Sequence, residues 1–220
     1  MRDNPYREDK EEIRELVKQF QNLKAGKSHS FLDEDSFEKI IDYFDGIEDL
    51  TQALEAVELG IGQYPYSSGL HIKKADLLIA TRRYYEALRV LNHVEVRDSN
   101  DINLYILKTD AYLALDQQEK AVELLENALQ LFDGAEQIEL LFELADVYDD
   151  YEEFDKVFDC LKLILEQEPS NEEALYKICF WTDFTGRNEE SIRLHQKIID
   201  DSPYNELAWF NLGAAYQGIK

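Results

Sequence analysis

The sequence is poor in the residues that interrupt helices. Among 220 residues there are only four prolines and nine glycines, too few to punctuate a fold of many short strands and turns. Basic residues are also scarce, because 23 lysines and arginines face 47 acids and leave a formal net charge of −24. Such a surface repels phosphate backbones and anionic lipids, which argues against nucleic acid and membrane partners. Cationic or amide-rich peptides are favoured instead, although plain solubility explains the same excess of acid.

Cysteine is equally scarce. Cys160 and Cys179 are the whole supply, so neither a disulfide framework nor a zinc site with the usual ligand spacing can be built. The first residues, Met1 to Arg7, carry no apolar signal-peptide run, and no later stretch approaches the length of a membrane span. The sequence therefore predicts a cytoplasmic protein in a reducing setting, with no cofactor.

What the sequence does contain is a period of about 34 residues. Small or β-branched residues expected to open a second helix recur at intervals of 34, 34, 36 and 34, at Ala53, Ala87, Ala121, Val157 and Ser191. Four places further on lie apolar residues and, in the last case, a histidine: Val57, Leu91, Leu125, Leu161 and His195. The prolines Pro65, Pro169 and Pro203 follow the same spacing. With 45% hydrophobic residues, the chain can bury the faces of these helices against one another.

The last segment carries the most specific motif. Trp209, Leu212, Gly213 and Tyr216 spell W-x2-L-G-x2-Y, with Pro203 six residues before the tryptophan. Over residues 34–220 the chain thus resembles the tetratricopeptide-repeat (TPR) family, in its bacterial multi-repeat form. The resemblance implies an all-α fold, a right-handed superhelical solenoid of helix-turn-helix repeats.

The period sets the expected repeat boundaries. The repeats are expected at 34–67, 68–101, 102–137, 138–171 and 172–205, with a partial repeat at 206–220. In the third, Asp133-Gly134 replaces the usual proline, and Gly134 is expected to cap the second helix in a left-handed conformation. Small residues are expected at the tight contact between the two helices of each repeat. They are Ala75, Thr109, Ala145, Cys179 and Gly213.

Residues 1–33 do not follow the period. An apolar face made of Ile13, Leu16, Val17, Phe20 and Leu23 predicts a helix from about Asp9 to Ala25, followed by a loop at Gly26–Phe31. We interpret this helix as a cap over the first repeat, since the end of a solenoid needs a cover. The alternative is an amphipathic membrane anchor. The polar face mixes acids with bases, which favours the cap.

Motifs for catalysis or metal binding fail on inspection. Gly26-Lys27-Ser28 lacks the first glycine and the preceding strand of a phosphate-binding loop. The histidines, namely His29, His71, His93 and His195, include no pair at helical metal-ligand spacing. His71 and His195 stand at packing positions of the repeat. The acidic run from Asp146 to Asp155 lacks the spacing of a calcium loop, and Cys179 stands at a packing position without a histidine base nearby in sequence.

The resemblance implies that the first helix of each repeat lines the concave surface. Matching places give one mostly apolar column: Glu38, Ile72, Ile106, Phe142, Tyr176 and Phe210. A second column, four residues further along each helix, is mostly aspartate: Asp42, Asp76, Asp110, Asp146, Phe180 and Ala214. The candidate ligand-binding residues are Asp42, Ile72, Asp76, Ile106, Asp110, Phe142, Asp146, Tyr176 and Phe180. The alternatives are a solvated face for the aspartates and contact between adjacent first helices for the apolar column.

The best-known TPR site holds the acidic C-termini of chaperones with lysines, asparagine and arginine. The corresponding places here carry Glu38, Asp42, Lys73, Asn103 and Leu107. A single base remains, and two acids oppose it. An acidic tail is therefore disfavoured as a ligand.

These observations favour a non-catalytic scaffold that binds a protein or peptide, basic or neutral, with spaced apolar residues. The alternative is a structural or self-assembly module at the N-terminal part of a larger protein. An enzyme would need a catalytic domain beyond residue 220. The final half repeat presents Trp209, Leu212 and Tyr216 without a partner helix, so self-association through this face, or a longer native chain, is expected.

Overall fold

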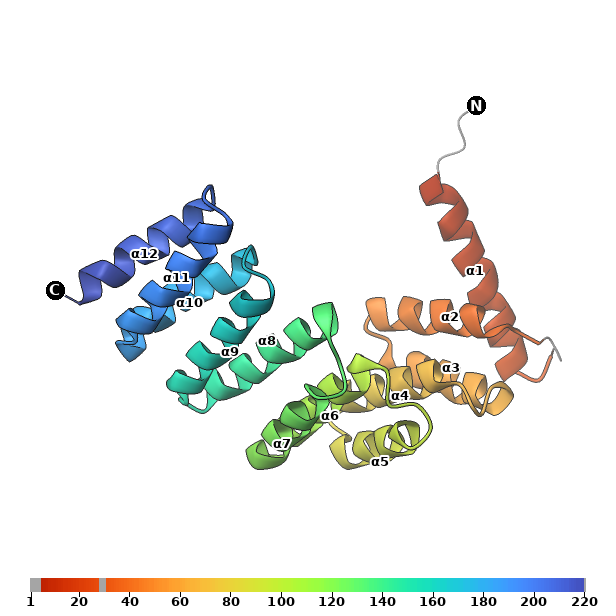
Figure 1. The fold of residues 1–220 in the computed structure, drawn as a ribbon. Helices are drawn as coiled ribbons and strands as arrows, with labels where there is room; N and C mark the ends of the chain where they lie inside the picture. The colour runs from red at the N-terminus through yellow and green to blue at the C-terminus, as the bar shows by residue number, and fades with distance from the viewer. Residues whose placement is uncertain (1–4, 28–30, 220) are drawn as a thin grey trace. The chain divides into compact units, whose positions relative to one another are not determined.

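The computed structural model describes residues 5–27 and 31–219, with side chains from residue 11 onward, so Ser28 and His29 lie outside the described residues. Within that part the chain forms twelve α-helices and no strand (Figure 1). The helices group into two compact units, residues 1–115 and 116–220. The first unit contains α1 (Pro5–Lys24), α2 (Glu34–Gly46), α3 (Leu50–Gln63), α4 (Ser68–Ala80), α5 (Tyr84–Glu95) and α6 (Ile102–Ala114). The second contains α7 (Gln118–Ala128), α8 (Gly134–Asp150), α9 (Phe154–Gln167), α10 (Glu172–Thr185), α11 (Asn188–Asp201) and α12 (Glu206–Gly218).

Most first helices begin at a side-chain cap. The capping oxygen accepts a hydrogen bond from a backbone N–H two or three residues further on, which satisfies one of the unpaired donors of the first turn. The capping residues are Asp33, Ser67, Asp101, Asn171 and Asn205, which precede α2, α4, α6, α10 and α12. The second helices α5, α7, α9 and α11 begin without such a bond. Their starts are fixed instead by the turn before them.

That turn contains one residue in the left-handed region. The backbone angle φ lies between 57° and 71° at Glu48, Arg82, Asp116, Glu152 and Gly186. These residues recur at intervals of 34, 34, 36 and 34, the spacing seen in the sequence. Only the last is glycine, the residue that adopts this conformation without steric penalty. The turn is therefore set by the packing of the helices on either side rather than by residue type.

The core of the first unit joins α1 to the helix pairs that follow. Phe20 of α1 is fully buried, with its ring centre 5.7 Å from that of Phe44 on α2. The same buried cluster includes Phe37 and Ile40 of α2, and Leu70 of α4. Leu16, Val17 and Leu23 of α1 pack against it from outside. The helix begins at Pro5, four residues before the expected start, and ends at Lys24, one residue before the expected end.

The repeat positions of the second helices are buried throughout. Ala53, Ala87, Ala121, Val157 and Ser191 are at most 3% exposed. The residues four places on, Val57, Leu91, Leu125, Leu161 and His195, are fully buried. The 34-residue period in the sequence thus marks one continuous buried stripe on each second helix. This stripe is the side that packs against neighbouring helices in a layered repeat.

A polar network replaces apolar packing at one place in the second unit. The Thr182 hydroxyl donates to Ser191 Oγ at 3.0 Å, and His195 Nδ1 lies 2.8 Å from the Ser191 carbonyl oxygen. Asn211 Nδ2 lies 3.2 Å from His195 Nε2 and donates to the Leu175 carbonyl at 2.7 Å. The imidazole is therefore satisfied as the neutral form, with its proton on Nδ1. Burial correspondingly lowers the pKa of His195.

Three expectations require correction. Helix α8 begins at Gly134, four residues before the expected start of the fourth repeat at 138. Gly134 has the predicted positive φ of 57°, but it opens α8, whereas α7 already ends at Ala128. Ala75, Thr109 and Ala145 are buried as expected. Cys179 is only half-buried. Gly213 is exposed, and within the described part of the chain no atom of another helix lies within 4 Å of the place where its Cβ would stand.

Candidate functional site

The aspartates of the first unit fall into two kinds. Asp42 on α2 is exposed and forms an ion pair with Lys73 of α4. Asp76 on α4 is exposed and Asp110 on α6 is half-buried, and at the place that corresponds to Lys73 the next repeat has Leu107. Lys73 thus forms its ion pair with Asp42, and its charge offsets only part of the rise in the pKa of Asp76.

Asp76 and Asp110 lie in an environment that disfavours their charge. The pKa of the Asp76 carboxyl is raised by loss of hydration first and by the nearby charge of Asp45 second. The pKa of Asp110 is raised by loss of hydration and then by the charge of Asp76. The Asp76 side chain still reaches water, so neighbouring atoms remove only part of its hydration shell. A cation brought to these two carboxylates would relieve an unfavourable interaction already present in the fold.

The apolar column is not uniformly accessible. Ile72 is only 8% exposed, so it packs within the chain and cannot offer a ligand surface, against the expectation from sequence. Ile106 and Phe142 are half-buried. Tyr176 and Phe210, by contrast, are 72% and 68% exposed. The exposed members of this column are therefore Tyr176 and Phe210, both in the second unit.

In the second unit, Asp146 of α8 faces a lysine of the next first helix. Lys177 Nζ lies 3.5 Å from Asp146 Oδ1 and 2.9 Å from Glu173 Oε1. The same ammonium stands over the ring of Phe142, 5.1 Å from its centre. Two carboxylates and one aromatic face therefore surround a single cation, an arrangement in which both the ring quadrupole and the negative charges attract it.

An aromatic surface covers α10. Tyr176, Phe180 and Phe184 follow one another at four-residue spacing and are each more than half exposed. Phe180 and Phe184 stack with ring centres 5.9 Å apart, and both contact Trp181, which in turn stacks on Phe154 of α9. Phe184 and Trp181 were not singled out from the sequence. The regular spacing of Tyr176, Phe180 and Phe184 on one helix was the available signal.

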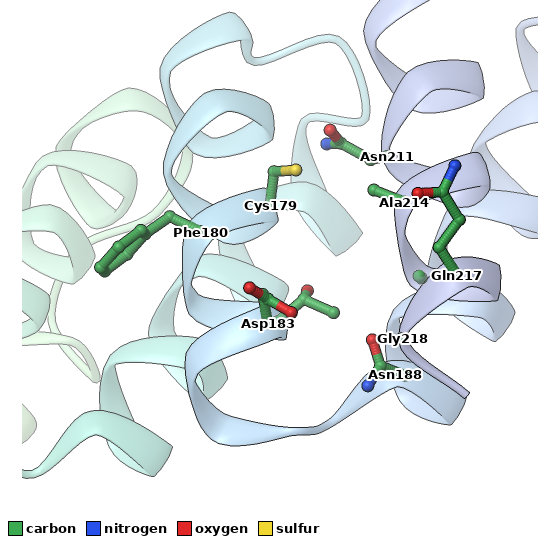
Figure 2. A pocket seen from close by; sticks show the side chains of 10 residues that line it. Cys179, Phe180, Asp183, Asn188, Asn211, Ala214, Gln217 and Gly218 are labelled. Atoms are coloured by element: carbon green, nitrogen blue, oxygen red, sulfur yellow. The ribbon is translucent and has the colours of Figure 1, made fainter. Parts of the chain in front are cut away.

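A groove runs between α10 and α12, where two cavities share Cys179, Phe180 and Asn211 as lining residues. The cavity of about 690 Å³ is lined by Tyr176, Phe210 and Glu206 in addition. The lining of the cavity of about 430 Å³ also includes the polar side chains of Asp183 on α10 and Gln217 on α12. Figure 2 shows this second cavity, with Cys179 and Asp183 on one side and Asn211, Ala214 and Gln217 on the other.

The two cysteines are poor candidates for nucleophiles. Burial raises the pKa of Cys160 to about 12, and burial likewise raises the pKa of Cys179. Both thiols therefore remain protonated near neutral pH. They are also free of disulfide bonds. Within the described residues, no group of three or more metal-ligating side chains comes together.

The negative charge is unevenly divided. Residues 116–220 carry 25 acids against 8 lysines and arginines, a formal charge of −17, whereas residues 1–115 carry 22 acids against 15 bases, a charge of −7. The groove between α10 and α12 thus belongs to the more acidic unit. Its aromatic surface is surrounded by a negative potential that attracts cations and repels anions.

Neither a family model nor a curated protein matches the sequence. Solved structures do match. TTC0263, a thermophilic TPR protein from Thermus thermophilus, is 18% identical, with a TM-score of 0.55 over 84% of this chain and 100% of that one. YrrB, described as a TPR protein with an unusual peptide-binding site, is 16% identical, with a TM-score of 0.51 over 89% and 96%. MamA is 18% identical, with a TM-score of 0.54 over 76% and 90%.

These similarities define the class of the protein. It is an all-α helical-repeat protein, built of consecutive helix pairs. More specifically, the helix pairs have the tetratricopeptide-repeat fold, as the 34-residue period predicts. No helix in the described part of the chain is both long and apolar enough to cross a bilayer.

Proposed function

We propose that the protein is a non-catalytic scaffold that binds a protein or peptide segment along the faces of its first helices. The segment is basic or neutral and carries spaced apolar residues. The observation that carries this proposal is the exposed aromatic stripe of Tyr176, Phe180 and Phe184 on α10, set in the more acidic unit. Apolar surface of this kind, rimmed by polar residues, marks an interaction site more often than a solvated face.

The electrostatics of the first unit support the same ligand chemistry. Asp76 and Asp110 repel one another, so a lysine, an arginine or a backbone N–H of a ligand would be favoured there. The ion pair of Lys73 with Asp42 removes the only base from the places that bind an acidic tail in the chaperone-binding site. YrrB, whose structure is similar, is described as having a peptide-binding site. Both free cysteines fit the reducing, cytoplasmic setting that we include in the proposal.

A salt titration of peptide binding tests this function. A peptide selected on wild-type protein from a library of varied charge would be compared on Asp76→Asn, Asp110→Asn and the double variant. We expect the double variant to bind about tenfold more weakly at low salt, and the difference to shrink as the Debye length falls from about 10 Å at 0.1 M to about 3 Å at 1 M. If the double variant binds as tightly as wild type at low salt, these aspartates are only a solvated face.

A second candidate function, as a structural module that associates with itself, has one specific observation in its favour. On α12, Trp209 and Tyr216 are 53% and 43% exposed, and Gly213 between them has open space where a side chain would stand. Leu212 is 8% exposed and packs within the chain, so it does not add to this face. Light scattering over a concentration series would decide the matter. If the wild-type protein is a monomer at every concentration, self-association is excluded. If it associates and Trp209→Ala leaves the association unchanged, this face of α12 is not the contact.

A further inference from the structure

One pair of neighbouring first helices in the second unit, called here a step of the repeat, shows how the faces of these helices hold a cation. Between α8 and α10 the ammonium of Lys177 lies over the Phe142 ring and beside the carboxylates of Asp146 and Glu173. The step thus contains an aromatic face, negative charge and a resident base. The aromatic face and the carboxylates supply the attraction, and the chain fills the place with its own lysine.

The next step of the repeat has the aromatic faces without a base. Thirty-four residues on, Tyr176 replaces Phe142, and Asn211 replaces Lys177. Asn211 is only 3% exposed, and its amide nitrogen already serves the Leu175 carbonyl and His195. It therefore cannot reach out as a substitute donor.

A cavity of about 690 Å³ stands at this place, between α10 and α12. Three of its lining residues are the rings of Tyr176, Phe180 and Phe210, each at least 60% exposed. Glu206, in the first turn of α12, supplies a carboxylate, and no lysine or arginine of the described residues lines the cavity. Phe180, in the place of Asp146, and Phe210, in the place of Tyr176 itself, make this step richer in aromatic surface than the one before it.

We propose that this cavity, called here the aromatic pocket, receives an arginine or lysine side chain of the partner segment. The aliphatic stem lies against Phe180 and Phe210, the charged head meets Glu206, and the apolar neighbours of that residue extend along the α10 stripe towards Phe184. This inference rests on the proposed function and names its anchor. It commits to a cationic segment of another protein.

Charge complementarity selects that occupant over the others. An acidic segment would meet Glu206 within a unit of formal charge −17. A second copy of this chain would bring the same excess of acid against itself, so electrostatics opposes it. A purely apolar segment would fill the pocket but leave the Glu206 carboxylate without a counter-charge, and would lose hydration around it for no gain.

The test uses synthetic heptapeptides of alanine and leucine that differ only in the central residue. That residue is arginine, its neutral near-isostere citrulline, lysine, norleucine or glutamate. Affinities for the full chain would be measured by fluorescence anisotropy, and the contact would be located by NMR shifts of the Asn211 side-chain amide. We expect arginine to exceed citrulline by about tenfold, or about 1.4 kcal/mol, with lysine above norleucine and glutamate the weakest.

Matched variants assign the effect to the pocket. Glu206→Gln should remove most of the preference for arginine over citrulline, whereas Glu166→Gln, an exposed carboxylate of α9 outside the pocket, changes net charge equally and should not. Phe210→Ala should weaken all the peptides, whereas Tyr85→Ala should not, although Tyr85 is 67% exposed and Phe210 68%. All four are surface changes, so folding is preserved.

The outcomes separate the inference from the function on which it rests. Equal binding of the arginine and citrulline peptides, or an arginine preference that survives Glu206→Gln and Phe210→Ala, overturns the aromatic pocket. If such peptides bind and are weakened by Asp76→Asn with Asp110→Asn instead, the scaffold function stands and its anchor lies in the first unit. Tightest binding of the glutamate peptide, binding of a second copy, or no binding by any of the peptides contradicts the inference. The last result also counts against the scaffold function.

Discussion

Lys73 of α4 forms an ion pair with Asp42 of α2, thirty-one residues before it, and so covers the first carboxylate of the aspartate column. Lys73→Gln would uncover it. We expect a cationic peptide to associate several-fold faster at low salt, because charge mainly governs the rate of encounter. The pair is accessible to solvent, so stability should change by less than about 1 kcal/mol. Stopped-flow kinetics and thermal melting measure the two effects. An unchanged association rate would contradict a role for Asp42 in ligand capture.

Asp76→Asn should stabilise the first unit at neutral pH. Folding raises the pKa of this carboxyl, so its charged form is less favourable in the folded chain than in the unfolded one. The penalty is present at pH 7, shrinks as the pH falls through the raised pKa, and is gone below the ordinary value near 3.8, where the carboxyl is protonated in both states. Urea unfolding of wild type and variant from pH 3 to pH 8 tests this. A stability difference that grows on acidification would refute the argument.

His195→Leu should make the second unit less sensitive to mild acid. The folded state holds this histidine neutral and lowers its pKa, while the unfolded chain binds a proton near pH 6.5. Wild-type stability contributed by this group is therefore complete above about pH 6.5 and is lost as the pH falls towards the depressed pKa. Leucine occupies the same place in three other repeats, at Leu91, Leu125 and Leu161. Calorimetry at pH 5 and pH 8 should show a smaller difference in stability between the two pH values for the variant than for wild type. An equal difference would contradict the prediction.

Gly60→Leu should destabilise the first unit by about 1–3 kcal/mol through overpacking. A Cβ on Gly60 would lie 3.1 Å from Phe37 Cγ and 3.2 Å from Leu70 Cδ1, both in the core. Gly62→Ala, two residues on in the same helix, is the control. Among the described residues, no atom beyond its chain neighbours and the backbone of its own helix lies within 4 Å of that Cβ, so better helix propensity should stabilise by up to about 1 kcal/mol. Chemical denaturation measures both, and equal effects of the two changes would show that Gly60 is not tightly packed.

The helical framework was readable from sequence because each helix pair repeats the same packing problem. Ala121 and Leu125 fall at the predicted places and are fully buried, since a layered helix has one side that no solvent reaches. The turn residues were not readable. Glu48 and Arg82 have no special preference for the left-handed region, so the neighbouring helices impose that conformation. The start of α8 at Gly134 was missed because the extra residues of the third repeat lengthen the next first helix.

The candidate site was only partly predictable. Listing residues at a fixed spacing assumes that equivalent positions of the repeat have the same surroundings. Ile72 and Tyr176 occupy equivalent positions, yet Ile72 is buried and Tyr176 is exposed. The difference arises from side-chain size and from neighbours on other helices, which the spacing does not encode. The pairing of Lys177 with Asp146 was equally hidden, since the two residues lie 31 positions apart. A scan for bases at that separation from each aspartate would have found it.

The uneven charge of the two units would make the proposed cationic partner a counter-ion as well as a ligand. A unit of formal charge −17 resists its own compaction. Dissolved salt screens the repulsion among these charges, and the screening should stabilise the second unit more than the first. The melting temperature of the second unit should therefore rise more with ionic strength than that of the first. The proposed cationic segment would neutralise the same charge at one place and with a defined stoichiometry. If it binds the folded unit alone, it would stabilise that unit further as its concentration rises above its Kd. Dilute buffer should therefore make the second unit the more dependent of the two on being bound.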